Sequence, residues 1–337
     1  MTALKNSLGC ALFLSALLSP LGARAAECGP DIASSCLDPD HVWPTGQAGA
    51  FLLLPRADIP RGSIGSLRAA TTYIDRPLLV SSPGGGPEVN TNGAVSSRFT
   101  TTLGGAVHFG DRLAVDGVIP IVWGQNGSGA ALVTGGSTLP TTAISDLRLG
   151  ATVQLWRSED FSSVEDAESG GAWSVRLGMS LPTGVSGAFA GGTSVVVAPS
   201  TSFIFRKGRL FGTLSAGARF REKVDFLDLR LGQELMAGFG GGLDILNRSR
   251  LSVVLETQTF LVLHPQRNLA VGPAGVFTGV SDRVTVPTEW HLGVRSAPVS
   301  PNWAIAGGFG TAIPFGEGTA VGTPAYRFSL RVEAMLR

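Results

Sequence analysis

Apolar and polar residues alternate along most of the chain, in segments of about ten residues separated by glycine, proline and charged positions. In residues 98–109, Phe99 and Leu103 occupy one parity, whereas Arg98 and Thr102 occupy the other. A period of two predicts a β-strand with one apolar and one polar face. The pattern predicts about twelve strands, at residues 64–74, 98–109, 112–123, 146–157, 172–182, 195–206, 209–221, 229–245, 251–260, 288–296, 302–313 and 326–337.

Strand length and the links between strands favour a membrane barrel over a soluble sandwich. The segments approach the 9 to 11 residues that a tilted membrane strand requires and exceed the ~5 to 6 of soluble strands. Short links at 110–111, 207–208, 247–249 and 298–301 alternate with long ones at 76–94, 124–145, 183–194 and 264–287. This is typical of short periplasmic turns and long outer loops. The acidic link at 157–171 departs from the rule and has no calcium-loop spacing, so we expect a solvated charge run.

Aromatic residues on the apolar parity gather near the predicted strand ends. Rings of aromatic side chains lie at both membrane interfaces of outer-membrane barrels. We therefore predict an all-β, antiparallel, up-and-down transmembrane β-barrel with two aromatic girdles, formed by Phe109, Trp173, Phe205 and Trp303 at one rim and Trp123, Phe220, Trp290 and Tyr326 at the other.

The first residues predict export. Lys5 precedes an apolar run from Leu8 to Leu21, and the small residues around Ala25 fit a signal peptidase site, so we expect a signal peptide at 1–25. Beyond it, no apolar run reaches the 18 residues of a membrane helix. We expect residues 26–60 to form a periplasmic segment, with the N-terminus on that side, and 61–337 to form the barrel in the outer membrane of a Gram-negative bacterium.

Two cysteines follow the predicted cleavage site, Cys28 and Cys36. Because the periplasm is oxidising, we predict a disulfide between them. The segment 37–60 contains the apolar run Phe51 to Leu54, and three arrangements remain open for it: a plug inside the barrel, a linker or another strand.

The polar parity carries an excess of arginine. With 15% charged residues and a net charge of +1 overall, the chain gives no reason to expect nucleic acid. An arginine facing lipid at mid-membrane costs about 2–4 kcal/mol, so these charges are expected to face inward. Glycines of the same parity, such as Gly238 and Gly240, are expected to leave room in the lumen. The predicted lumen-lining residues are Arg68, Arg98, Asp116, Arg148, Arg176, Arg206, Arg219, Arg230, Glu234, Glu256, Glu289, Arg295, Arg327, Arg331 and Glu333.

Several segments resemble the barrel region of OmpA-family outer-membrane proteins of myxobacteria and their relatives. They are GDRLAVDGVIPIVWGQNG, ISDLRLGATVQLW, WSVRLGMSLPTG, RKGRLFGTLSAGARFR and LGQELMAGFGGGLDIL, within residues 63–263. The resemblance implies a barrel assembled in the outer membrane. The peptidoglycan-binding domain that often follows in that family is expected to be lacking, and Met335-Leu336-Arg337 departs from the usual terminal aromatic of assembly signals.

Two functions fit these observations. The leading hypothesis is a passive channel or solute-uptake barrel whose inward arginines bias it towards anions. The alternative is a non-conducting structural barrel, filled by Arg–Glu bridges, that displays its loops. Expected partners are outer-membrane lipid, the barrel-assembly machinery and small solutes. No cofactor, metal site or catalytic residue is expected. His264 lies on the same outer side as Asp225, Asp228 and Asp282, but no catalytic motif links these residues.

Overall fold

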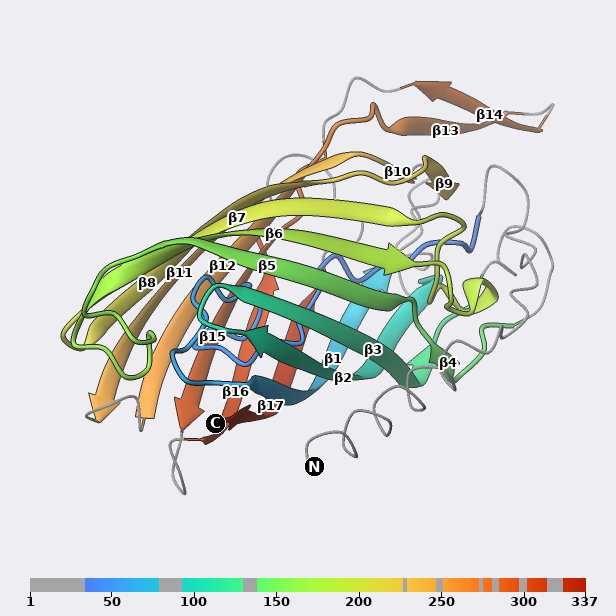
Figure 1. Ribbon diagram of the computed structural model, residues 1–337. Helices are drawn as coiled ribbons and strands as arrows, with labels where there is room; N and C mark the ends of the chain where they lie inside the picture. Colours follow the sequence, from blue (N-terminus) through green and yellow to red (C-terminus); the bar gives the residue numbers. More distant parts are fainter. Residues whose placement is uncertain are drawn as a thin grey trace, which may run out of the picture.

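Twelve antiparallel strands form one closed barrel (Figure 1). The computed structural model describes residues 34–78, 93–129, 138–226, 229–246, 251–272, 275–280, 285–296, 302–313 and 324–337. The barrel strands are β1 (Gly65–Leu78), β2 (Val95–Phe109), β3 (Leu113–Asn126), β5 (Leu147–Arg157), β6 (Ser169–Leu181), β7 (Val196–Lys207), β8 (Leu210–Arg219), β11 (Glu234–Leu246), β12 (Leu251–Val262), β15 (Thr288–Ser296), β16 (Trp303–Ala312) and β17 (Tyr326–Leu336).

Neighbouring strands in the sequence are neighbours in the sheet. β17 pairs with β1, with Gly65 opposite Leu336, and the ring closes without a free edge. The predicted up-and-down barrel is therefore confirmed. Among the described residues, no helix is long and apolar enough to cross a membrane.

One predicted strand was too long. The sequence pattern placed a single strand at 229–245, but Leu229–Leu231 forms the short strand β10, which pairs with β9 (Val224–Phe226) in a separate two-stranded sheet. The barrel strand β11 begins only at Glu234, because Gly232 and Gln233 interrupt the pairing. The remaining short strands are β4 (Ala143–Ile144), which pairs with β3 in antiparallel orientation, and the pair β13 (Arg267–Gly272) and β14 (Gly275–Val280).

The two ends of the barrel differ in their links. The short-link rim carries the links between β2 and β3, β5 and β6, β7 and β8, β11 and β12, and β15 and β16, together with the start of β1 and the end of β17. The long-link rim carries all the others, including β9, β10, β13 and β14. Short and long connections therefore lie at opposite ends, except for the long β5–β6 link, which lies at the short-link rim as the sequence predicted.

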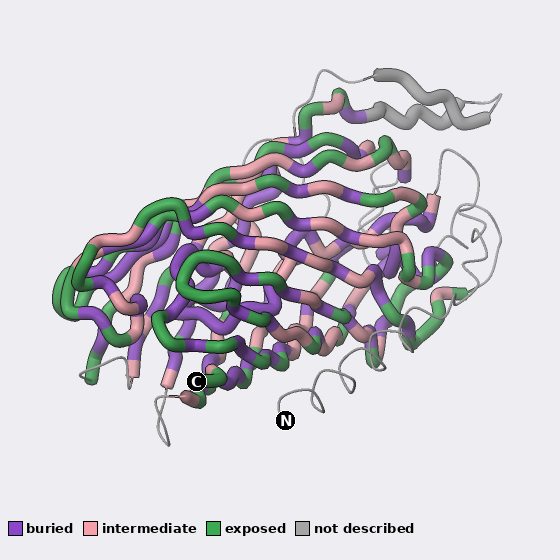
Figure 2. The backbone as a smooth tube through the Cα atoms, in the orientation of Figure 1, coloured by how far each residue is buried: buried purple, intermediate pink, exposed green. Residues whose placement is uncertain are grey.

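The alternation of the sequence corresponds to the two faces of the wall. Exposed and buried residues alternate along the strands in Figure 2, as expected for side chains that point to opposite faces of a sheet. Leu103, Leu177 and Leu214 are exposed on the outside, whereas Arg98, Arg206 and Arg219 are buried on the inside. An apolar outer surface around a polar interior is the arrangement of a barrel that lies in lipid.

The lumen contains the described part of the chain that precedes β1. Residues 34–64, named here the inner segment, lack a helix or strand and run inside the ring of strands (blue in Figure 1). Phe51, Leu52, Leu53 and Leu54 of this segment are buried in a cluster with Phe161, Phe211 and Val254. Of the three arrangements open from the sequence, the structure has the plug, and the described part of the expected periplasmic segment 26–60 lies within the barrel.

The inward glycines explain how the segment fits. A Cβ atom on Gly240 would lie 2.6 Å from Cε1 of Phe51, and one on Gly293 would lie 2.5 Å from Cδ1 of Leu52. The room that glycines such as Gly240 were expected to leave in the lumen is therefore occupied by apolar side chains of the inner segment.

Candidate functional site: the occupied lumen

The inner segment crosses the lumen from one rim to the other. At the long-link rim, Ser34 N donates to Asp225 O over 3.0 Å, and Leu37 packs with Phe189 and Phe226. At the short-link rim, Arg61 N donates to Ser162 O over 3.3 Å. The described N-terminal end thus lies at the long-link rim, opposite to the rim of short turns at which the sequence analysis placed the N-terminus. The reason is that the chain crosses the lumen once before β1 begins.

Glu256 on β12 anchors the middle of the segment. Its carboxylate accepts hydrogen bonds from the backbone N–H groups of Leu52, Leu53 and Leu54, at 2.6, 2.9 and 3.0 Å. Irregular backbone cannot satisfy its own polar groups, so a buried segment of this kind needs partners from the wall. Hydrogen bonds to an ionised acceptor are stronger than neutral ones, which makes Glu256 the main backbone anchor of the segment.

Wall arginines satisfy the carbonyl groups of the same stretch. Arg331 on β17 donates to Gly49 O over 2.6 Å and also to Phe51 O. Arg68 on β1 donates to Leu52 O over 2.9 Å and to Thr45 O over 3.2 Å. These side chains therefore line no open path, since they hold backbone atoms of the inner segment.

Two carboxylates of the segment bind three further arginines near the long-link rim. Asp38 accepts from Arg98 and from Arg148, each over 3.0 Å, with one oxygen for each. Asp40 accepts from Arg327 through both oxygens, at 2.9 and 3.2 Å. Burial alone would raise the pKa of Asp40, but the Arg327 guanidinium holds that pKa below its ordinary value. Asp40 is therefore ionised at neutral pH.

Other inward charges pair within the wall. Arg176 bonds Asp116, Arg206 bonds Asp244, Arg219 bonds Glu234 over 3.1 Å, and Arg295 bonds Glu333 over 3.1 Å. Several pairs span an intervening strand. Arg176 on β6 reaches Asp116 on β3 across Gly150 of β5, where a Cβ would collide with the guanidinium. These bridges join the strands to each other. Some of their groups also hold the inner segment, since Asp116 accepts from Gly46 N over 3.0 Å and Arg219 donates to His41 O over 3.0 Å.

A further ion pair closes the short-link rim. Arg56 of the segment donates to Asp58 over 2.8 Å and to Glu165, in the β5–β6 link, over 2.6 Å. Burial raises the pKa of Glu165, but Arg56 and Arg295 lower it to about 2. The β5–β6 link is therefore not only a solvated charge run: Glu159, Asp160, Asp166 and Glu168 are exposed, whereas Phe161 and Val164 are buried in the lumenal cluster.

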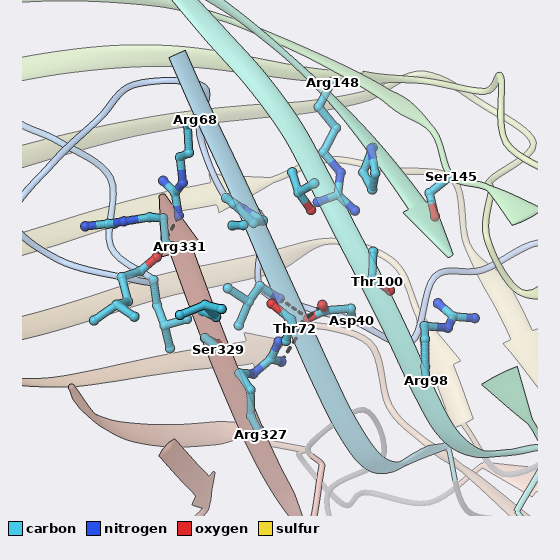
Figure 3. A pocket seen from close by; sticks show the side chains of 18 of the residues that line it. Asp40, Arg68, Thr72, Arg98, Thr100, Ser145, Arg148, Arg327, Ser329 and Arg331 are labelled. Atoms are coloured by element: carbon cyan, nitrogen blue, oxygen red, sulfur yellow. Dashed lines mark hydrogen bonds and ion pairs between the residues drawn. The ribbon is translucent and has the colours of Figure 1, made fainter. Parts of the chain in front are cut away.

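The cavities beside the segment are small. One, lined by Asp38, Asp40, Arg98, Arg148 and Arg327 among others, has a volume of about 30 Å³ (Figure 3). Another, beside Trp43, Arg176 and Gln258, has a volume of about 80 Å³. One water needs a cavity volume of at least ~10–15 Å³, so each of these cavities holds a few waters. With the segment in place, these spaces are too small for an organic solute.

The structure brings nearly all predicted lumen-lining residues into the barrel. Nine of the predicted arginines and all five predicted carboxylates lie on the inner face of the barrel strands. With Asp244, which also points inward, the carboxylates number six, so the inner face of the strands has an excess of three positive charges. The exception is Arg230, which lies on β10 outside the barrel wall and pairs with Asp225 over 2.8 Å. Its parity was assigned from the overlong predicted strand, which is why the prediction for Arg230 was wrong.

The predicted aromatic girdle residues follow the two rims. Phe109, Trp173, Phe205 and Trp303 lie on the outer face towards the short-link rim, and their side chains are 41–57% exposed. Trp123, Phe220, Trp290 and Tyr326 lie towards the long-link rim. Trp290 and Tyr326 are half-buried, because Trp290 packs against Phe309 and Tyr326 packs against Tyr73 and Phe328.

The remaining predicted groups yield no site. Cys36 is buried, but Cys28 lies outside the described residues with the signal peptide, so the disulfide stays a prediction. His264 is half-buried and Asp225 is paired with Arg230, while Asp228 and Asp282 lie outside the described residues. Within the described part of the chain, no group of three or more His, Cys, Asp or Glu residues could hold a metal ion.

Sequence reasoning missed the residues of the segment that face the wall. Asp38, Asp40, Arg56 and Trp43 were not among the predicted site residues, although Arg219 and Arg148 lie 4.0 and 4.9 Å from the Trp43 ring. The available signal was charge complementarity: residues 34–60 carry three aspartates and one arginine, opposite to the excess on the wall.

Comparison with known proteins finds similar folds among solved structures. No family model matches the chain, and no curated protein matches it, so the resemblance to OmpA-family barrels is not confirmed. An outer membrane channel from Pseudomonas putida F1 aligns with a TM-score of 0.54 at 13% identity, over 86% of this chain and 99% of that chain.

Two further solved structures align less closely. The NanC porin gives a TM-score of 0.43 at 9% identity, over 81% of this chain and 99% of that chain. A FadL homologue from Pseudomonas aeruginosa gives a TM-score of 0.39 at 10% identity, over 86% of this chain and 100% of that chain. The alignment with the channel from Pseudomonas putida shows that the chain has the fold of an outer-membrane β-barrel.

Proposed function

We propose that this protein is an outer-membrane channel for small anionic solutes, which its own inner segment keeps closed. In this proposal the long-link rim faces the outside and the short-link rim faces the periplasm, as in other barrels with this distribution of links. The lumen becomes a path when the segment moves, and the exposed arginines then favour anions.

One observation carries the proposal: the lumen is filled by a segment without regular structure, which the wall holds through polar contacts to its backbone and through the apolar cluster around Phe51. The segment has no strand pairing with the wall, and Glu256, Arg331 and Arg68 hold its backbone. Such contacts exchange readily for water, because each hydrogen bond contributes only about 0.5–3 kcal/mol net. The barrel ring, by contrast, is closed by continuous strand pairing around its circumference.

The alternative is a structural barrel that never conducts, and the small size of the cavities favours it. The two proposals differ in what happens when the segment is loosened. A channel opens, whereas a structural barrel loses order in its interior without a selective current.

Loosening the segment at Glu256 tests the proposal. Glu256→Gln removes the charge that accepts three backbone N–H groups, so we expect the open probability in planar bilayers to rise at least tenfold over the wild type. We expect the open state to prefer anions. Adding Arg98→Gln with Arg148→Gln is expected to reduce that preference, because both arginines then lack charge in the lumen.

Two matched variants control this experiment. Glu168→Gln makes the same change at an exposed position of the β5–β6 link and is expected to leave the current unchanged. Asp244→Asn changes a buried carboxylate whose partners are Arg206 and Ser252, and is expected to lower stability without opening the barrel. A folded Glu256→Gln barrel that stays silent, or that prefers cations, would contradict the proposal.

A further inference from the structure

Four strands bring a cluster of arginines to one side of the lumen, near the long-link rim (Figure 3). Arg98 on β2, Arg148 on β5 and Arg327 on β17 surround the carboxylates of Asp38 and Asp40, at 2.9–3.2 Å. Each carboxylate uses both of its oxygens. The arrangement is that of a binding site whose two anionic groups belong to the inner segment itself.

Hydroxyl groups complete this cavity. Thr72, Thr100, Ser145 and Ser329 line it with the arginines (Figure 3). Within the described residues, Oγ of Ser329 and Nε of Arg148 are buried and have no hydrogen-bond partner. Buried polar atoms without a partner are uncommon in proteins and point to a ligand or water that supplies one.

The charge of the cavity exceeds what the segment neutralises. Five arginines line the cavity, and among the described residues Asp38 and Asp40 are its only lining carboxylates. The glutamates that assist two of these arginines, Glu289 and Glu333, belong to the wall and stay in place when the segment moves. Without the segment, Arg98 and Arg148 lose the carboxylate that they share.

We propose that this cavity binds a small hydroxylated dicarboxylate, and that Asp38 and Asp40 occupy the site as an internal mimic of that solute. The proposal rests on the proposed function and deepens it, because it names the class of anion that the channel takes. A dicarboxylate offers the same two groups to Arg98, Arg148 and Arg327, and its hydroxyls meet Ser329 and the threonines.

Binding requires displacement of the segment. The cavity volume of about 30 Å³ leaves space for a few waters and none for a second pair of carboxylates. The solute and the two aspartates therefore compete for one site. Competition of this kind couples binding of the solute to release of the end of the segment, since each excludes the other.

Calorimetric titration of the folded, full-length chain in detergent with tartrate tests the proposal. We expect saturable binding, and we expect Asp38→Asn with Asp40→Asn to tighten it at least tenfold, because the internal competitor is gone. Arg98→Gln with Arg148→Gln is expected to weaken it at least tenfold. Asp160→Asn, at an exposed position of the β5–β6 link, is the matched control and should leave the affinity unchanged.

The competing explanations give different results. If the aspartates serve only to fix the segment, the Asp38→Asn, Asp40→Asn variant gains no affinity for tartrate, and the proposal fails. Should that variant not give a heat-modifiable barrel, Asp38→Asn alone carries the same test. Neutral erythritol must not bind, because it lacks the carboxylates.

The proposed binding site and the proposed channel function can be refuted independently of each other. Tartrate binding by a barrel that never conducts would overturn the channel while leaving the site. A conducting barrel in which neither the wild type nor the Asp38→Asn, Asp40→Asn variant binds tartrate would overturn the site alone.

Discussion

Two groups of buried arginines line the same lumen and differ in where their carboxylates come from. Arg176, Arg206 and Arg219 find theirs on neighbouring strands, at Asp116, Asp244 and Glu234. Arg98 and Arg148 share Asp38, which belongs to the inner segment. The ion pairs of the first group join wall strands to each other, although Arg219 also donates to His41 O of the inner segment, whereas the ion pairs of the second group join the wall to the inner segment. Under the proposed function, the ion pairs of the first group serve stability and those of the second group serve gating.

Breaking a bridge of the first group is expected to have the largest effect on stability. In Arg206→Gln, Asp244 stays buried and loses the guanidinium of Arg206. We expect the free energy of unfolding to fall by about 3–5 kcal/mol, as for other broken buried pairs. Denaturant titration of the folded barrel in detergent measures this loss.

Replacement of both partners by apolar residues, Arg206→Met with Asp244→Leu, is the control and should recover most of the loss, since no charge then stays buried. The open probability of the refolded Arg206→Gln barrel is expected to stay within threefold of the wild type. A large rise in current without loss of stability would mean that Arg206 belongs to the gating group.

An effect of intermediate size is expected when the pH is lowered and His41 takes up a proton. Burial lowers the pKa of His41 to about 4, while Glu234 raises it and Arg219 and Arg221 lower it. The neutral form is thus preferred in the lumen, whereas a released segment takes up a proton below its ordinary pKa of 6.5. Protonation therefore favours release, beginning below pH 6.5 and saturating near pH 4.

On this basis, lowering the pH from 7 to 5 should raise the open probability on the order of tenfold. The groups that face His41 are Glu234, Arg219, Arg221, Asp40 and the Phe260 ring, and neither ring nitrogen has a hydrogen-bond partner among the described residues. His41→Gln removes the titrating group, so its current should vary less than threefold over the same range. An unchanged acid response in His41→Gln would assign the response to another group.

The strands of the barrel wall could be predicted from the sequence far better than the position of the inner segment. The period of two recurs in every strand because each strand meets lipid on one side and polar groups on the other, so Leu103 and Arg98 reveal their faces without knowledge of any partner. The inner segment has no such period. It lies between side chains of many strands, and its position depends on contacts such as Leu53 with Glu256, more than 200 residues apart.

The glycines illustrate the same limit. The sequence predicts room in the lumen beside Gly238 and Gly240, which is correct for the strand alone. The structure fills the space beside Gly238 with Leu54 and the space beside Gly240 with Phe51. A glycine on the inner face of a strand is compatible with an empty space and also with close packing of another part of the chain. The strand sequence does not distinguish these two cases.

The smallest effect is expected for a charge pair that belongs to neither group. Arg337 and Asp166 lie 3.0 Å apart at the short-link rim, with side chains 42% and 45% exposed. Exposed pairs contribute little, so Arg337→Ala should change the free energy of unfolding by less than about 0.5 kcal/mol and leave the current unaltered.

At the same rim, Arg56→Gln offers the matched buried case, because Arg56 joins the inner segment to Asp58 and to Glu165 of the β5–β6 link. We expect Arg56→Gln to raise the open probability severalfold while Arg337→Ala does not. Equal currents from the two variants would mean that the short-link rim does not take part in closure, and gating would then depend on the contacts of Glu256 and of the two aspartates.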